Sequence, residues 1–139
     1  ILDFKNFDII TPNEREARFS LGDQDSSIRP LATALYKKSK CKLLILKLAE
    51  KGILSYRKEN WRNIDSFYVL DSLVENLVDP IGAGDALISY ATLSMCASNN
   101  HAITSIISLI AASLSCEKEG NVTIKVTEVL EKIAKIEKY

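Results

Sequence analysis

The chain has 139 residues, which is enough for one domain or for a part of a larger one. Its hydrophobic fraction of 47% suffices for a buried core, and its 18 basic residues balance 18 acidic ones, so no overall charge attracts nucleic acid or an anionic membrane. No apolar run reaches the roughly 18 residues of a membrane-spanning helix, and we expect no secretory signal.

The three cysteines are Cys41, Cys96 and Cys116. They are too widely spaced for a metal-binding motif, and their number is odd. We therefore expect reduced thiols in a cytoplasmic protein.

The first part of the chain predicts strands that alternate with helices. Residues 7–13, FDIITPN, form a short apolar run ended by Pro12, which is typical of a buried strand that runs into a turn. A short helix closed by Gly22 follows, and apolar residues at helical spacing predict a second helix within 26–40. The nearly all-apolar run 42–49 is typical of a strand covered on both faces.

The second part begins with a hairpin pattern and continues with helices. Residues 53–70 read as strand, polar turn and strand, with the turn near 58–60. A helix is predicted over about 83–97, and a very apolar one lies within 99–120, closed by Gly120. An amphipathic helix from 126 ends the chain.

This alternation predicts an α/β fold with a largely parallel sheet, flanking helices and one β-hairpin. Such sheets bind ligands at the carboxyl ends of their strands. Polar or glycine residues occupy such positions in DIITPN (8–13), LLILKLAEKG (43–52) and VDPIGAGD (78–85). We therefore expect these three segments to share one rim of the sheet.

The last of these segments places Gly82, Ala83 and Gly84 before Asp85, at the start of a long helix. It is not a mononucleotide P-loop, because no Lys follows Gly84, nor a dinucleotide fingerprint, because Leu87 stands where a third Gly is needed. A turn without bulky side chains still lets an anion approach the unpaired N–H groups of a helix start.

Asp85 has two interpretations on these grounds. It can cap the helix, which contributes about 1 kcal/mol. It can also act as a general base beside an anion hole and take a proton from a hydroxyl that attacks phosphorus, with backbone donors and Mg²⁺ balancing the charge. The residues alone leave both open.

Residues 79–85, DPIGAGD, resemble the D-x-x-G-A-G-D signature of the ribokinase-like (PfkB) carbohydrate kinases. Three other segments resemble that family in the same order along nearly the whole chain. They are ITPNEREA (10–17), LILKLAEKG (44–52) and AASLSCEKEGNVT (111–123). Among the subfamilies, these motifs resemble those of heptose-phosphate kinases most.

The resemblance implies a ribokinase-like fold, of which residues 1–139 are a single nucleotide-binding segment from the C-terminal part. We expect the sugar-binding and lid portion to lie outside these residues, so that the segment alone has little kinase activity. The implied reaction is ATP-dependent phosphoryl transfer to a hydroxyl of a sugar or sugar phosphate. It requires Mg²⁺, and the family also includes monovalent-cation sites and homodimers.

By its position in the signature, Asp85 matches the catalytic base. Gly82, Ala83 and Gly84 match the anion hole for the transferred phosphoryl group. Asp79 stands at the first position of the signature, near the family's monovalent-cation site.

The other two segments supply residues on the nucleotide side. Asn13 and Glu16 match residues that organise Mg²⁺ and phosphate, often through water. The sequence also allows a helix-capping box for this pair. Lys47 and Gly52 match the strand end and the turn that pass over the nucleotide.

Four positions depart from the family pattern. Ile81 and Lys47 stand where Thr is usual, Ala49 where Gly or Ser is usual, and Leu109 where Asn is frequent. These changes motivate an alternative, a catalytically weakened homologue with a binding or regulatory role. A second alternative is a ribokinase, fructokinase or nucleoside-kinase relative.

Two remaining polar features are best explained as structural. His101 is predicted at a helix start on the surface and lacks a partner pattern for a catalytic triad. The basic cluster Lys37, Lys38 and Lys40 is interpreted as a solvated helix end, because no aromatic residues alternate with it as in nucleic-acid sites.

Overall fold

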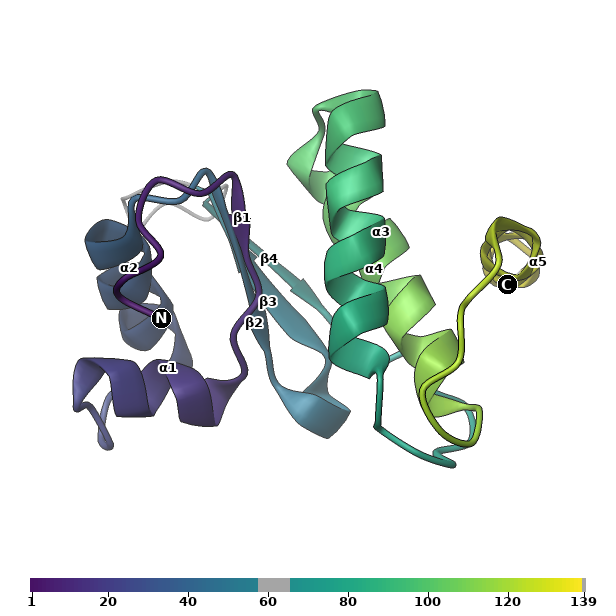
Figure 1. The fold of residues 1–139 in the computed structure, drawn as a ribbon, viewed down its shortest axis with the longest axis horizontal. Coiled ribbons are helices and arrows are strands. Elements are labelled where there is room, and N and C mark those ends of the chain that lie inside the picture. The colour runs from purple at the N-terminus through teal and green to yellow at the C-terminus, as the bar shows by residue number, and fades with distance from the viewer. Residues whose placement is uncertain (58–65, 139) are drawn as a thin grey trace. The chain divides into compact units, whose positions relative to one another are not determined.

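The computed structural model describes residues 1–57 and 66–138. The chain forms two compact units, Ile1–Asp71 and Ser72–Tyr139, and each is described by itself (Figure 1). The turn expected near residues 58–60 lies outside the described residues.

The described residues of the first unit form strands, α-helices and a 3-10 helix. In chain order these are β1 (Ile9–Ile10), α1 (Glu14–Leu21), α2 (Ile28–Ser39), β2 (Leu43–Lys47), η1 (Ala49–Lys51), β3 (Ile53–Tyr56) and β4 (Phe67–Leu70). The expected strands, both helices and the hairpin strands are all present at these places.

The four strands form one sheet in the order β1-β2-β3-β4. β1 and β2 are parallel, whereas β2 with β3 and β3 with β4 are antiparallel. The α/β class and the hairpin are therefore confirmed, but the expectation of a largely parallel sheet does not hold for the strands described. The reason is that β3 folds back onto β2 after the turn at Ala49–Lys51, while the predicted hairpin pairs β4 with β3.

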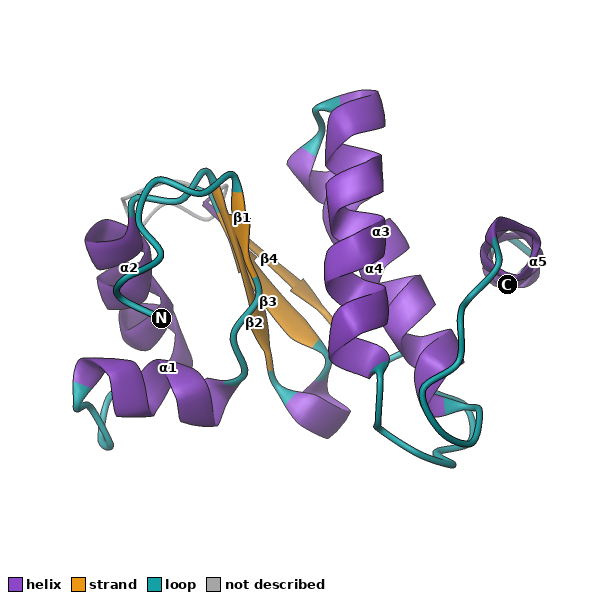
Figure 2. Ribbon diagram, in the orientation of Figure 1, coloured by secondary structure: helices purple, strands orange, loops and turns teal. Residues whose placement is uncertain are grey.

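Helices α1 and α2 cover one face of this sheet (Figure 2). Their apolar stripes supply Ala17, Leu31 and Leu35 to a core that also contains Leu44 and Tyr56 from the strands. The alternate residues of β2, Leu43 and Ile45, are fully buried as well. The prediction of a buried strand is thus confirmed.

The second unit consists of three helices, α3 (Ala83–Ser98), α4 (His101–Cys116) and α5 (Val126–Ile136). α4 packs against both α3 and α5. As expected, α4 is mostly buried, but it ends at Cys116 rather than at Gly120. Gly120 instead lies in the following turn, at a φ of 72°.

A buried ion pair anchors α5. The side chain of Lys132 is 6% exposed, and its ammonium lies 2.6 Å from Glu117 Oε1 and 3.6 Å from Glu75 Oε1. Glu117 Oε1 also accepts the backbone N–H of Glu75 at 2.8 Å. One carboxylate therefore ties α5 to the segment that leads toward α3.

Within the described ranges, none of the helices is both long and apolar enough to span a membrane. The three cysteines are free thiols, of which Cys41 is buried and Cys96 exposed. Burial raises the pKa of the Cys41 thiol.

Candidate functional site

In the first unit, two of the three predicted segments meet at one rim of the sheet. β1 and β2 run parallel, so their carboxyl ends lie side by side, and Asn13 forms an isolated parallel bridge with Lys47. The backbone N–H of Lys47 donates to the Pro12 carbonyl at 2.8 Å. The polar residues that follow these two strands are thus neighbours, as predicted.

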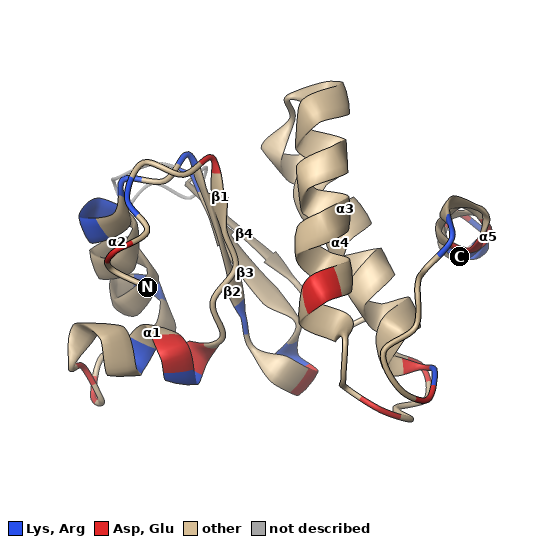
Figure 3. Cartoon of the chain, in the orientation of Figure 1, with Lys and Arg blue, Asp and Glu red and all other residues tan. Residues whose placement is uncertain are grey.

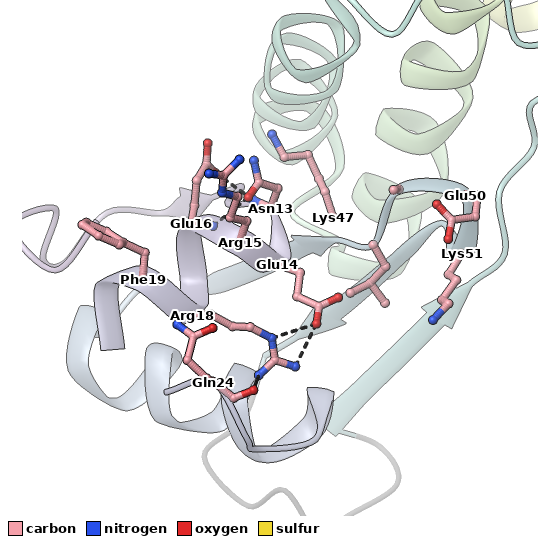
Figure 4. A pocket seen from close by; sticks show the side chains of 12 residues that line it. Asn13, Glu14, Arg15, Glu16, Arg18, Phe19, Gln24, Lys47, Glu50 and Lys51 are labelled. Atoms are coloured by element: carbon pink, nitrogen blue, oxygen red, sulfur yellow. Dashed lines mark hydrogen bonds and ion pairs between the residues drawn. The ribbon is translucent and has the colours of Figure 1, made fainter. Parts of the chain in front are cut away.

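The same rim borders an open pocket of about 940 Å³. Its wall comes from α1 on one side and from the end of β2 with η1 on the other, and it includes Asn13, Glu16 and Lys47. Figure 4 shows these three side chains together with Arg15 at one end of the pocket. Among the described residues, the side chains of Arg15 and Lys47 form no hydrogen bond or ion pair.

The opposite part of this wall is held by Arg18. Its guanidinium bonds the Glu14 carboxylate at 2.8 Å and donates to the carbonyls of Gln24 and Ser26 (Figure 4). Arg18 therefore fixes the loop after α1 and is unavailable to a ligand. Sequence reasoning missed both this role and the open position of Arg15, because Arg15 stands at a variable position of ITPNEREA (10–17) and Arg18 lies beyond it.

Asn13 and Glu16 form the capping box that the sequence allowed as an alternative. Asn13 Oδ1 accepts the Glu16 N–H at 2.7 Å, and Glu16 Oε2 accepts the Asn13 N–H at 2.8 Å. These bonds satisfy two orphan donors at the start of α1. They leave Glu16 Oε1 without a donor among the described residues.

The turn between β2 and β3 contains two residues with unusual backbone angles. Gly52 has a φ of 83°, and Ala49 has a φ of 53°, in the left-handed region. A side chain disfavours this region, so Ala49 carries backbone strain where the family usually has Gly or Ser. The turn nevertheless closes, with the Gly52 N–H donating to the Ala49 carbonyl at 3.0 Å.

In the second unit, the glycine turn opens α3. Gly82 is the N-cap residue at a φ of 84°, and Ala83 is the first helical residue. The Ala83 N–H donates to the Pro80 carbonyl at 3.3 Å, whereas the N–H groups of Gly82, Gly84 and Asp85 find no acceptor in the part of the chain described. Unpaired donors at a helix start can bind an anion. Residues 71–82, which lead into this turn, form no strand.

Asp85 is exposed in the first turn of α3 and is the only charged residue on that helix (Figure 3). Its carboxylate accepts no hydrogen bond from the described residues. The helix-cap interpretation is therefore not realised, and the carboxylate remains available to an external donor.

Asp79 links the glycine turn to the turn after α4. Its Oδ1 accepts the Ile81 N–H at 2.9 Å, and its Oδ2 accepts the Gly120 N–H at 3.0 Å. Burial, followed by the charges of Glu117 and Asp79, raises the pKa of the Cys116 thiol. A protonated thiol beside Asp79 is a poor nucleophile.

Two of the departures from the family pattern differ in their surroundings. Ile81 is 60% exposed beside the glycine turn, so its apolar side chain replaces a hydroxyl at an accessible place. Leu109, in contrast, is 5% exposed within α4. His101, expected on the surface, is half-exposed at the start of α4.

A family model described as "pfkB family carbohydrate kinase" matches residues 4–127. The chain belongs to the pfkB family of carbohydrate kinases. The match includes all four segments on which the resemblance was based and leaves out only the two ends of the chain. Comparison with curated proteins gives no significant sequence match.

Solved structures of pfkB-type kinases share the fold. Phosphofructokinase-2 from Escherichia coli in complex with potassium superposes with a TM-score of 0.82 at 17% identity, over 98% of this chain and 43% of that one. Ribokinase from Thermotoga maritima gives 0.76 at 22% identity, over 91% and 42%. Ribokinase from Giardia lamblia gives 0.76 at 20% identity, over 93% and 44%. The chain thus has a ribokinase-like fold and spans less than half the length of these structures.

Proposed function

We propose that this chain is the nucleotide-binding segment of an ATP-dependent kinase that phosphorylates a hydroxyl group of a sugar or sugar phosphate. The observation that carries the proposal is the start of α3. An exposed, unbonded carboxylate on Asp85 follows a turn whose N–H groups at Gly82 and Gly84 have no acceptor among the described residues. Membership of the pfkB family supports the same reaction class.

In this proposal Asp85 accepts the proton of the acceptor hydroxyl. The hydroxyl oxygen then forms a bond to the γ-phosphorus of ATP, and the bond between that phosphorus and ADP breaks. The N–H groups of Gly82, Ala83 and Gly84 donate to the oxygens of the transferred group, where negative charge is concentrated. Of the three, Ala83 would have to give up its long bond to Pro80.

Asn13, Glu16, Lys47 and Gly52 are proposed to serve the nucleotide side. Lys47 places a cation in the pocket of the first unit, and Gly52 lets the backbone turn there. Glu16 Oε1 fits a Mg²⁺ ion that keeps several of its waters, because such ions use only one or two carboxylates together with substrate phosphates. Mg²⁺ supplies charge neutralisation on the phosphates when bound.

The finer assignments rest on the resemblance. A heptose phosphate is the acceptor that the sequence wording favours, and a monovalent cation is proposed near Asp79. The solved structure of phosphofructokinase-2 in complex with potassium motivates a test of K⁺ dependence for this protein. Replacement of K⁺ by a bulky organic cation is expected to lower the turnover of the full-length protein.

The experiment that tests the proposal measures ADP release by the full-length protein with a panel of sugars and sugar phosphates, heptose phosphates included. Asp85→Asn is expected to lower kcat by about 10²- to 10⁴-fold, because it removes the general base. Asp71→Asn, the same change at another exposed position, serves as the control. Equal turnover of the Asp85→Asn variant and the wild type would refute the assignment of the base.

The capping box allows a second test that separates folding from catalysis. Glu16→Gln keeps an oxygen that can accept the Asn13 N–H but removes the negative charge. We expect unchanged thermal stability and a higher Mg²⁺ concentration for half-maximal turnover. An unchanged Mg²⁺ requirement would leave Glu16 with the capping role alone.

The alternative function is a weakened homologue that binds nucleotide or sugar without turning it over. The apolar side chain of Ile81 at an exposed position beside the glycine turn favours it. Binding of ATP by a full-length protein that phosphorylates no member of the panel would support this alternative.

A further inference from the structure

The carboxylate of Asp79 joins two parts of the second unit that are distant in sequence. Oδ1 accepts the N–H of Ile81, and Oδ2 accepts the N–H of Gly120. The first bond is a local turn contact of a kind that Asp often makes. The second reaches the turn that follows α4, so Asp79 does more than shape its own turn.

Further contacts hold the same two segments together. The N–H groups of Val78 and Asp79 both donate to the Cys116 carbonyl, at 2.8 and 3.1 Å. A side chain on Gly82 would place its Cβ 2.4 Å from Asn121 Oδ1. The glycine turn is therefore fixed by the backbone bonds of Val78 and Asp79, by the Asp79 carboxylate and by close packing at Gly82.

We propose that Asp79 is a positioning residue that sets the direction of the N–H groups of Gly82 and Gly84. This inference rests on the proposed function, in which these groups receive the transferred phosphoryl oxygens. Asp79 acts through the backbone, since its bond to the Ile81 N–H fixes the Pro80–Ile81 peptide, one peptide before the one that carries the Gly82 N–H.

The physical reason lies in the strength and geometry of the two bonds. Bonds from N–H groups to an ionised carboxylate are stronger than bonds between neutral groups. Donors stabilise a transition state only when they already point to where charge develops. A turn preceded by Pro80 and containing two glycines needs an external anchor to keep such a direction, and Gly120 supplies it through Asp79.

The test compares Asp79→Asn with Asp71→Asn in the full-length protein. An amide keeps one acceptor oxygen but presents an NH₂ group to one of the two N–H donors, so one bond is lost. We expect kcat to fall about 10- to 100-fold, as for a misplacement of roughly 1 Å, with KM for the sugar within about twofold of wild type. The Asp71→Asn control should retain wild-type kcat.

Amide hydrogen exchange distinguishes a local loosening of the turn from a general loss of stability. In Asp79→Asn, the amides of Ile81 or Gly120 should exchange faster, while that of the buried Ile110 in α4 keeps its protection. A kcat within about twofold of wild type overturns the inference. So does a loss of kcat with wild-type exchange at both amides, because Asp79 would then act by another route.

Failure of the proposed function gives a different result. If the wild type phosphorylates no sugar, the test of the inference is the change in the amide resonances of Gly82 and Gly84 on addition of a non-hydrolysable ATP analogue with Mg²⁺. A shift of these resonances that is present in wild type and lost in Asp79→Asn supports the positioning role. Identical shifts in both proteins, or no shift in wild type, overturn it.

Discussion

At Gly82 both the backbone angle and the packing exclude a side chain. Its φ is 84°, and an added Cβ would lie 2.4 Å from Asn121 Oδ1. Gly82→Ala should therefore lower the free energy of unfolding by about 1–2 kcal/mol for the left-handed angle and by about 1 kcal/mol more for the contact. Denaturant unfolding measures the difference.

Gly120→Ala is the matched control for this substitution. Gly120 also has a positive φ, 72°, but an added Cβ would meet nothing within 4 Å. It should lose only the backbone contribution. In the double variant Gly82→Ala/Asn121→Ala the excess loss should shrink, because the contact with Asn121 Oδ1 is removed while that with Asn121 Cα, at 3.2 Å, remains. Equal losses for Gly82→Ala and Gly120→Ala would contradict the packing argument.

Glu128 stabilises the second unit at neutral pH, and this contribution is lost in acid. A hydrogen bond from Lys118, and then one from the Lys125 N–H, hold the pKa of the Glu128 carboxyl below its ordinary value of 4.5. A depressed pKa contributes stability above the unfolded-state value and loses it as pH falls through the folded-state value. The contribution of this partly exposed pair is about 1 kcal/mol or less.

Glu128→Gln should accordingly be less stable than wild type at about pH 7, with the difference vanishing toward about pH 3. Urea unfolding at several pH values measures it. Glu131→Gln, at an exposed position of the same helix, should show no such trend. A difference that persisted unchanged in acid would rule out the Lys118–Glu128 pair as its source.

Among individual residues, the sequence placed Asp85 and the glycine turn at a helix start, because helix periodicity and small residues are local signals. For Asn13 and Glu16 it left two roles open, since a capping box and a Mg²⁺ site use the same residue types. It could not foresee that Asp79 reaches Gly120, because such a bond depends on how α4 returns to the turn.

At the scale of elements, Lys132 determines how firmly α5 is attached. Its ammonium is buried and pairs with Glu117 at 2.6 Å. Lys132→Met keeps most of the side-chain volume but leaves the Glu117 carboxylate without its counter-charge, so the free energy of unfolding should fall by about 3 kcal/mol. Thermal or urea unfolding measures the loss.

The exposed Lys135 on the same helix provides the control, and Lys135→Met should change stability little. The double variant Lys132→Met/Glu117→Gln should recover part of the loss, because no carboxylate is left unpaired. No recovery in the double variant would show that the packing of Lys132, and not its charge, holds the helix.

Helices were predicted better than strand pairing. Gly22 ends α1 as expected, and its N–H donates to the carbonyl groups of Arg18 and Phe19. Gly120 was expected to end α4, but its N–H is used by Asp79 instead. Strand β1 comprises only Ile9–Ile10 of the longer apolar run, because Pro12 has no N–H to continue the ladder.

At the scale of the whole molecule, the order of motifs predicted the α/β class and the family. Local patterns do not specify which strands pair, and so the sheet proved mixed where a largely parallel one was expected. The division of the chain into Ile1–Asp71 and Ser72–Tyr139 was not foreseen, because no linker composition marks it.

Residues 1–139 alone are expected to have little kinase activity. The chain spans 43% of Escherichia coli phosphofructokinase-2, so the segment lacks more than half of the length of such a fold. Sugar-dependent ADP release by the segment should be near background under conditions in which the full-length protein phosphorylates its sugar. Comparable turnover of the two would disprove this prediction.

The small side chains of α4 have a consequence for how the activity of this protein could change by mutation. Thr104, Ser105, Ser108 and Ala111 are buried in a helix that packs directly against α3, which carries Asp85. Because these side chains are buried, a larger residue at one of these positions forces its neighbours or α4 itself to shift. Single substitutions in the interior of α4 are thus expected to move the helix against which α3 packs, without altering any residue that is proposed to touch a ligand.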